Sequence, residues 1–178
     1  MSNIWLISDT HFNHNKDFIW KARGFNSVEE MNETIIKNWN NVIQPNDIVY
    51  HLGDVIMGKL DAGIPLIKRL NGKIKLAIGN HDTAMRLAAF KELFDEINFG
   101  YRLKKGKKTF LLTHYPTLVD NYDDPVKVYS IHGHAHSPNA FCEHPFMYNV
   151  NCDAHDCKPI LFEDVIEDIY NHKINGQK

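Results

Sequence analysis

One pattern recurs three times in the first half of the chain and constrains its fold more than any other feature. A short apolar run is followed by a small residue and then by side chains that can bind a metal ion. The runs are Ile4–Ile7, Ile48–Leu52 and Ile74–Ile78. The four consecutive apolar residues of the first run are typical of a strand buried on both faces, and the other two runs are also read as strands. Helical patterns lie between them, so the sequence predicts an α/β fold.

Polar side chains stand where each of these strands should end. Asp9 and His11 follow the first run, Asp54 the second and Asn80 the third. Residues two apart on a strand point to the same side, so Asp9 and His11 would converge. Open α/β sheets bind ligands at the carboxyl ends of their strands. One such pair could be a strand end that faces water, but the recurrence favours a binding site. His51 lies within its strand and is expected to have a structural or supporting role.

The stretches between the strands carry helix signals. Ser27 and Glu30 fit a capping box, and a helical apolar face follows until Pro45. Further helices are expected over Ala62–Leu70 and Thr83–Glu92. The second half predicts a hairpin of Ile97–Leu103 and Thr109–Thr113, strands at Val128–Ile131 and Phe146–Val150, and a helix over Glu163–His172. The hairpin turn holds four lysines, which we interpret as a solvated tip rather than a nucleic-acid patch.

Composition sets outer limits on the function. With 178 residues, a single domain spanning 1–178 is expected. A formal charge of −2 provides no general attraction for a polyanion. The cysteines form no CxxC pair and are expected to be free thiols in a reducing compartment; they are Cys142, Cys152 and Cys157. No apolar run is long enough for a membrane helix. We therefore expect a cytoplasmic protein with no membrane partner.

The strand-end residues form a candidate metal-binding set of oxygen and nitrogen donors. Its members are Asp9, His11, Asp54, Asn80, His114, His132 and His134. Such donors suit Mn, Fe, Zn or Ni better than an all-oxygen Ca or Mg site. Seven ligands are too many for one open catalytic site, but they suffice for two metals if one carboxylate bridges. Asp54, which lies centrally in the order, is the candidate bridge.

In these blocks the sequence resembles the calcineurin-like metallophosphoesterases, particularly their small single-domain bacterial and phage members. The matching blocks are Asp9-x-His11, Gly53-Asp54, Gly79-Asn80-His81-Asp82, His114, and Gly133 with its flanking His132 and His134, within the run His132-Gly133-His134-Ala135-His136. All five occur in the family's order. The fourth block often has Gly before His, whereas this chain has Thr113; residue 113 is not a ligand, so no loss of metal is expected.

The resemblance implies an α/β fold of two mixed β-sheets packed face to face with flanking helices, a four-layer sandwich. It implies two divalent ions, with Mn as our first choice and Fe, Zn or Ni as alternatives. The implied ligands of one ion are Asp9, His11, Asp54 and His134, and those of the other are Asp54, Asn80, His114 and His132. The implied reaction is hydrolysis of a phosphoester, preferably a diester, by a hydroxide that bridges the metals.

Further roles follow from the same resemblance. His81 would protonate the leaving oxygen or hold a phosphoryl oxygen, and Asp82 would orient it. The substrate would be a small phosphoester, possibly a nucleotide, contacted by Asn80, His81 and His14, although His14 could equally be a loop histidine that faces solvent. The loops Phe12–Asn26 and Val119–Val126 would select it. Asp153 and His155 would be parts of a structural loop or would support the site from outside.

Two other functions remain open at this stage. The chain could be a catalytically silent metal-binding scaffold for a protein partner, although it retains every expected ligand. It could also be a nuclease that acts on RNA or DNA ends. We expect no obligatory protein partner, and homo-oligomers are possible.

Overall fold

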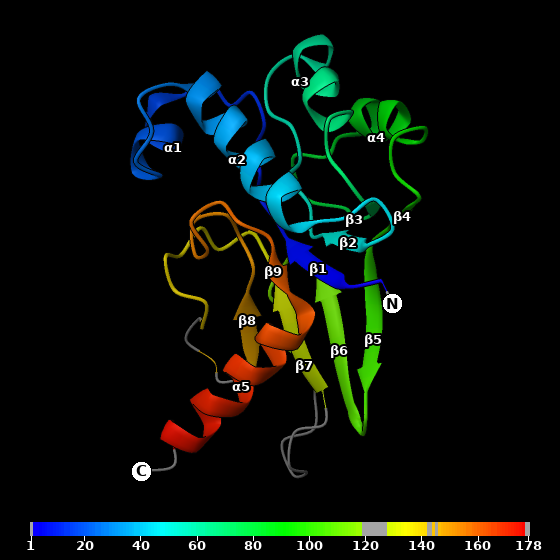
Figure 1. Cartoon of the computed structure of the whole chain (residues 1–178), viewed down its shortest axis with the longest axis vertical. Coiled ribbons are helices and arrows are strands. Elements are labelled where there is room, and N and C mark those ends of the chain that lie inside the picture. Colours follow the sequence, from blue (N-terminus) through cyan, green and yellow to red (C-terminus); the bar gives the residue numbers. More distant parts are fainter. Residues whose placement is uncertain (1, 119–127, 142–143, 145, 177–178) are drawn as a thin grey trace.

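The computed structural model describes residues 2–118, 128–141, 144 and 146–176, and it arranges them around two β-sheets (Figure 1). The first sheet has the strand order β4-β3-β2-β1-β9. Its strands are β1 (Ile4–Ile7), β2 (Ile48–His51), β3 (Lys73–Ala77), β4 (Glu96–Asn98) and β9 (Ile160–Leu161). Strands β1 to β4 are parallel, whereas β9 runs antiparallel to β1. The three repeated apolar runs are therefore neighbours in one sheet, as the alternation predicts.

The second sheet has the strand order β5-β6-β7-β8. Its strands are β5 (Gly100–Lys105), β6 (Lys108–Thr113), β7 (Val128–His132) and β8 (Met147–Asn149). The pair β5 and β6 is the expected antiparallel hairpin, and β6, β7 and β8 are parallel. One boundary of the prediction is wrong, because Ile97 pairs with Leu76 in the first sheet and β5 begins only at Gly100. Both sheets are mixed, which confirms the expected fold class.

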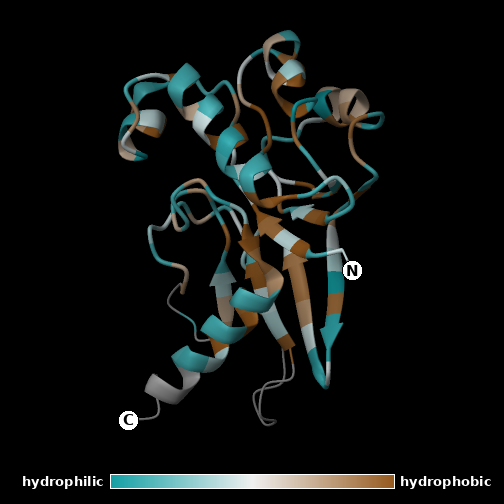
Figure 2. Ribbon diagram, in the orientation of Figure 1, coloured by the Kyte–Doolittle hydropathy of each residue, from teal (hydrophilic) through white to brown (hydrophobic). Residues whose placement is uncertain are grey.

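Helices α2 (Val28–Val42), α3 (Leu60–Ile67) and α4 (Ala84–Phe90) cover one face of the first sheet (Figure 1). Ser27 caps α2 as predicted, since its hydroxyl accepts the Glu30 N–H at 3.1 Å. Trp39 of α2 packs with Val49 of the sheet in the apolar cluster under these helices. Figure 2 shows the same division, with polar residues on the outer side of α2 and apolar residues in the strands. A short helix that we did not predict, α1 (Asp17–Ala22), precedes α2.

A second apolar cluster joins the two sheets. Leu6 and Leu52 of the first sheet's region meet Phe110 and Ile131 of the second. Helix α5 (Phe162–Gly176) adds Val165 to the same cluster. It begins directly after β9 and extends beyond the predicted end at His172. The terminal helix thus closes the space between the sheets.

Backbone hydrogen bonds join the sheets at the carboxyl ends of their strands. The N–H of Ser8, which follows β1, donates to Val150 O at 3.1 Å, and Cys152 N–H donates back to Ser8 O at 3.1 Å. Within the second sheet, Gly133 N–H donates to His114 O at 3.0 Å and holds the segments after β6 and β7 together. Figure 1 shows the arrowheads of β6 and β8 directed toward the first sheet. The segments that follow β1, β2, β3, β6 and β7 therefore converge on one place.

Among the described residues, no helix is long and apolar enough to cross a membrane. The predicted loop Val119–Val126 and Cys142 lie outside the described residues.

Candidate active site

Potential metal ligands from both sheets meet where the strand ends converge. The ligand atoms of Asp9, His11 and His136 lie within 4.8 Å of one another, and so do those of Asp9, Asp54 and His114. The two groups share Asp9, so they form one continuous cluster. Four of these side chains are buried, whereas the His136 side chain is 37% exposed. The cluster is thus an enclosed centre that opens to solvent on one side.

Asp54 occupies the middle of this cluster. Its Oδ2 lies 3.6 Å from His114 Nε2, 3.9 Å from His11 Nε2 and 3.9 Å from His81 Nε2. Its Oδ1 is engaged, because it accepts the backbone N–H of His81 at 2.8 Å. One carboxylate oxygen therefore faces three imidazoles, which is the position that a bridging ligand requires.

Hydrogen bonds hold two histidines in the tautomer that leaves Nε2 available to a metal ion. His114 Nδ1 lies 2.8 Å from Leu52 O, and His136 Nδ1 lies 2.8 Å from an Asp153 carboxylate oxygen. A carbonyl or carboxylate oxygen only accepts, so each Nδ1 carries the proton. The Nε2 lone pairs then point into the centre. His114 Nε2 lies 2.8 Å from Asn80 Oδ1. A hydrogen bond at the far ring nitrogen is the usual support of a metal-binding histidine.

The donor set fits a divalent metal ion. Asp9 Oδ1 is buried and accepts no hydrogen bond, although it lies 3.7 Å from His11 Nε2 and 3.6 Å from His136 Nε2. A buried carboxylate oxygen with no partner is costly. A cation among these three atoms would provide the missing partner. Carboxylate, carboxamide and imidazole donors together suit first-row transition metals.

Burial shapes the charges of the centre. Burial lowers the pKa of His11 to about 2, so this ring is neutral and can donate a lone pair at neutral pH. The hydrogen bond to Asp153 raises the pKa of His136. Burial alone would raise the pKa of Asp153, but the hydrogen bonds from His136 and Arg23 hold it well below its usual range. Because a metal competes with the proton for His136 Nε2, its binding should weaken in acid.

The backbone is strained at the candidate ligands. Positive φ angles occur at Asp9 (55°), His11 (47°), Asp54 (58°), His134 (64°) and His136 (45°). Non-glycine residues in this region store roughly 1–3 kcal/mol each and cluster at functional sites. The sharp turns permit neighbouring residues to aim their side chains at one point. Four of the five residues in the two ligand groups have this backbone conformation, which Asn13, Asp156 and Cys157 also adopt outside the cluster.

Two glycines make room for the aspartates. A Cβ on Gly133 would lie 2.4 Å from Asp9 Oδ2, and one on Gly79 would lie 2.3 Å from Asp54 Oδ1. Neither position can accept a side chain without displacing a carboxylate. The glycines in the Gly79-Asn80 and Gly133 blocks thus have a steric function.

Asp82 braces the loops of the centre. Its carboxylate accepts backbone N–H groups of Asp54 at 2.9 Å, Val55 at 3.2 Å and Gly79 at 2.9 Å. Both oxygens are used in this way, whereas we had expected the carboxylate to orient the His81 ring. Asp82 therefore ties the segment after β2 to the segment after β3.

His81 lies at the open side of the centre. Its side chain is 43% exposed, and its ring lies 5.6 Å from that of His11. His14 lies on the other side of His11, at a ring distance of 5.6 Å, and contacts Phe18 at 5.7 Å. It is almost buried. Of the two, His81 is the better exposed to an incoming substrate.

The histidine run after β7 differs from the expected pairing. His132 is buried, its Nδ1 lies 2.7 Å from Gly133 O, and it belongs to neither ligand group found among the described residues. The His134 ring instead lies 5.1 Å from that of His114. His136, which the prediction omitted, stacks on His11 at 5.1 Å. Of the three histidines, His136 is the one that stands with Asp9 and His11 in a ligand group, whereas the expected His132 and His134 are in neither group among the described residues.

Spacing alone could not distinguish among three alternating histidines. Gly133 was the available signal: it must lie against Asp9 and Ser8, so the chain turns there and the residues after it face the centre.

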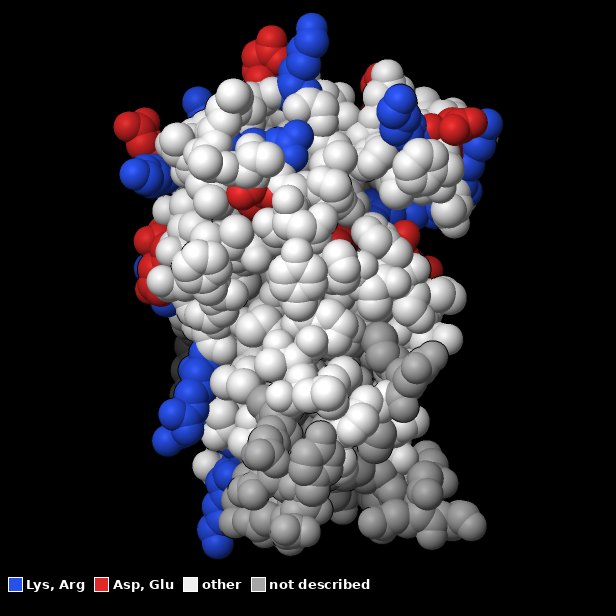
Figure 3. All heavy atoms as spheres, turned by 180° about the vertical axis from the view of Figure 1, so that it is seen from behind, with Lys and Arg blue, Asp and Glu red and all other residues white. Residues whose placement is uncertain are grey.

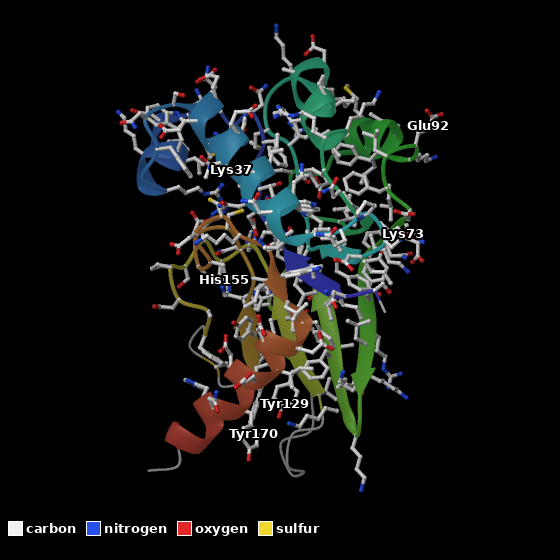
Figure 4. All side chains as sticks on the ribbon, viewed as in Figure 1. Lys37, Lys73, Glu92, Tyr129, His155 and Tyr170 are labelled. Atoms are coloured by element: carbon white, nitrogen blue, oxygen red, sulfur yellow. The ribbon has the colours of Figure 1, made fainter. Side chains whose placement is uncertain are left out.

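Of the other residues considered for the site, one contacts the centre and two have structural roles elsewhere. Asp153 reaches the centre through its hydrogen bond to His136. His155 does not, because its Nε2 lies 2.8 Å from Asn149 O and its ring stacks on Tyr148, on the loop between β8 and β9 (Figure 4). His51 is fully buried beside Thr10 Oγ1 at 3.0 Å and has a structural role.

Comparisons with known proteins identify the family and similar folds. The family model of the calcineurin-like phosphoesterase superfamily domain matches residues 2–151. The protein MJ1445 of Methanocaldococcus jannaschii is 39% identical over 185 residues, which cover 98% of this chain and 95% of the relative. The Gene 66 protein of Mycobacterium phage L5 is 27% identical over 201 residues, covering 97% and 96%. The crystal structure of AQ665 from Aquifex aeolicus superposes with a TM-score of 0.74 at 28% identity, covering 94% of this chain and 99% of that one.

Proposed function

The chain belongs to the calcineurin-like phosphoesterase superfamily, and from this premise we propose that it hydrolyses small phosphodiesters at a centre of two divalent metal ions. Membership and the clustered ligands support a metal-dependent phosphoesterase in general. The observation that carries the two-metal proposal is the position of Asp54 Oδ2, which faces His11 on one side and His114 on the other.

We assign the ligands in two overlapping sets. One ion would be held by Asp9, His11, Asp54 and His136, and the other by Asp54, Asn80, His114 and His134. Bound there, the ions would activate a water molecule for attack on phosphorus and neutralise charge on the phosphoryl oxygens. Mn²⁺ is our first choice for both positions, and the donor set also suits Fe, Zn or Ni.

His81 has the role of a proton donor or phosphoryl contact. Its backbone N–H is fixed on Asp54, while its ring stays half exposed above the cluster. A ring held in this way can give a proton to the leaving oxygen of a substrate bound at the centre. Asn80, beside His114, would contact the same phosphoryl group.

The open side of the centre favours a diester. A diester has organic groups on both sides of phosphorus, and both must find room. His81 is 43% exposed, and Tyr115, whose ring lies 4.7 Å from that of His134, is 50% exposed. Groups extending past either ring would reach solvent. A small nucleotide diester satisfies this arrangement.

The alternatives have less support. A catalytically silent metal-binding scaffold needs the ligands but not the half-exposed His81 ring beside them, and we propose no obligatory protein partner. A long nucleic acid needs a broad basic surface. Figure 3 shows one face on which Lys and Arg side chains lie mainly at the margins of the described atoms. Two hairpin lysines are also engaged, Lys105 with Glu163 at 3.1 Å and Lys108 over the Tyr129 ring.

We propose a cytoplasmic location on separate grounds. Cys152 and Cys157 are buried free thiols, which is typical of proteins from reducing compartments.

The test compares bis-p-nitrophenyl phosphate with p-nitrophenyl phosphate, using metal-stripped protein titrated with Mn²⁺. Turnover should rise with Mn²⁺ and favour the diester. Preference for the monoester would contradict the diester proposal. Absence of turnover on both esters, with two ions bound per chain, would contradict the hydrolytic function.

A further inference from the structure

A buried arginine contacts the candidate centre from the side of α1. Arg23 directly follows α1, and its side chain is 2% exposed. Its guanidinium donates to both Asp153 carboxylate oxygens, at 3.0 and 3.1 Å. It also donates to the backbone carbonyls of Asp9 at 2.8 Å and Thr10 at 3.3 Å. One guanidinium thus fixes the backbone of a candidate ligand and a carboxylate from the far end of the chain.

Asp153 connects Arg23 to a second candidate ligand, His136. The oxygen that accepts from Arg23 Nη2 also accepts from His136 Nδ1 at 2.8 Å. The His136 side chain is 37% exposed and stacks on the His11 ring on one face, and the Asp153 carboxylate holds its Nδ1. The bond fixes both its ring orientation and its tautomer. A buried ion pair is expensive to desolvate and is seldom kept for stability alone.

The two halves of the centre are supported differently. His136 is backed by a carboxylate that is itself paired with a guanidinium, whereas His114 is backed by the neutral carbonyl of Leu52. A carboxylate partner makes an imidazole a stronger donor than a carbonyl partner does. The centre is therefore asymmetric in its outer contacts.

We propose that Arg23 and Asp153 are positioning residues that preset His136 and make the Asp9, His11 and His136 position the higher-affinity metal position. This inference rests on the proposed two-metal centre. It goes beyond the ligand assignment because it ranks the two metal positions by affinity. It attributes the difference to Arg23 and Asp153, which belong to neither ligand set.

The experiment measures Mn²⁺ binding to the full chain by the electron paramagnetic resonance signal of free Mn²⁺. The wild type should bind one ion more tightly than the second. Asp153→Asn should weaken the tighter event by about 10- to 100-fold, the usual effect of losing such a partner, and leave the weaker event nearly unchanged. Glu33→Gln is the matched control, because it breaks another two-pronged arginine–carboxylate pair, with Arg69, on the exposed surface. It should change neither event.

A double-mutant cycle separates positioning from general support. If Asp153 acts through His136, then Asp153→Asn should add nothing in a His136→Gln background. Additive losses, equal weakening of both events, or an unchanged Asp153→Asn titration would overturn the proposal. Arg23→Lys, which keeps the charge but not the two-pronged geometry, should show a smaller loss of the same event. Two-ion binding without hydrolysis would refute the proposed function and leave this inference standing, whereas a wild type that binds no Mn²⁺ would refute both.

Discussion

Asp54 Oδ2 lies 3.6 Å from His114 Nε2, although the two residues follow strands of different sheets. The contact links the segment after β2 to the segment after β6. It depends on the junction at Ser8, where backbone hydrogen bonds with Val150 and Cys152 hold the ends of the two sheets together. The centre is therefore a property of the packed sheets rather than of either sheet alone.

Removing the charge of Asp54 should disable both metal positions together. Asp54→Asn keeps the shape of the side chain but replaces the oxyanion that faces His11 and His114. We expect a loss of about a hundredfold or more in kcat/KM and fewer than two ions per chain. Elemental analysis after gel filtration gives the stoichiometry. Retention of two tightly bound ions would refute the bridging role.

Truncating His81 should spare the metals and slow the chemistry. His81→Ala is expected to bind two ions and to lose about 10²- to 10⁴-fold in kcat, the usual contribution of a positioned proton donor. The loss should be larger for a substrate with an alkoxide leaving group than for a p-nitrophenyl ester, which needs little protonation. Equal losses for both would show that the ring holds a phosphoryl oxygen instead. Wild-type rates would exclude either role.

Adding a methyl group at Gly133 should displace Asp9. A Cβ there would lie 2.4 Å from Asp9 Oδ2 and 2.4 Å from Ser8 Oγ. Gly133→Ala should cost about 1–3 kcal/mol of unfolding free energy and weaken metal binding. Gly24→Ala provides the control for a purely backbone effect, since its φ is unfavourable (+81°), unlike that of Gly133, and no atom lies within 4 Å. It should lose about 1 kcal/mol without any effect on metals. The two variants can be compared by urea unfolding and Mn²⁺ titration.

Buried His51 should make the metal-free protein sensitive to acid. Burial lowers the pKa of His51 from 6.5 to about 3. Above pH 6.5 the ring is neutral in both states, so its contribution to stability is fully present. Between pH 6.5 and about 3 only the unfolded chain takes up the proton, and stability falls by about 1.4 kcal/mol per pH unit. His51→Gln should therefore show a shallower decline between pH 6 and 4 in urea unfolding. Parallel curves for the two proteins would contradict the assignment.

The sequence predicted the elements whose patterns are local. Apolar runs of four or five residues located β1, β2 and β3, and the Ser27 cap located the start of α2. Strand β9 has only two residues, Ile160 and Leu161, which is too short for any periodicity. Helix α1 has six residues and buries none of them fully, although Ile19 and Trp20 pack against the first apolar cluster, so its pattern is too short to reveal a helix.

The site was harder to predict than the fold because backbone turns determine which of the candidate side chains point into the metal centre. The positive φ angles of His134 and His136 decide which histidines face Asp9, and no spacing rule encodes them. The Arg23 and Asp153 pair spans 130 positions in the sequence and exists only after the sheets have packed. Residue types and block order indicated a metal centre, whereas the proposal of His136 as a ligand, and of His134 for the second ion rather than the first, needed the three-dimensional structure.

The most direct test of the two-metal account is anomalous diffraction at the manganese edge from crystals of the Mn²⁺-loaded protein. The account predicts two peaks on either side of Asp54, one contacted by Asp9, His11 and His136 and the other by Asn80, His114 and His134. A single peak, or a peak ligated by His132 in place of His134 or His136, would contradict it.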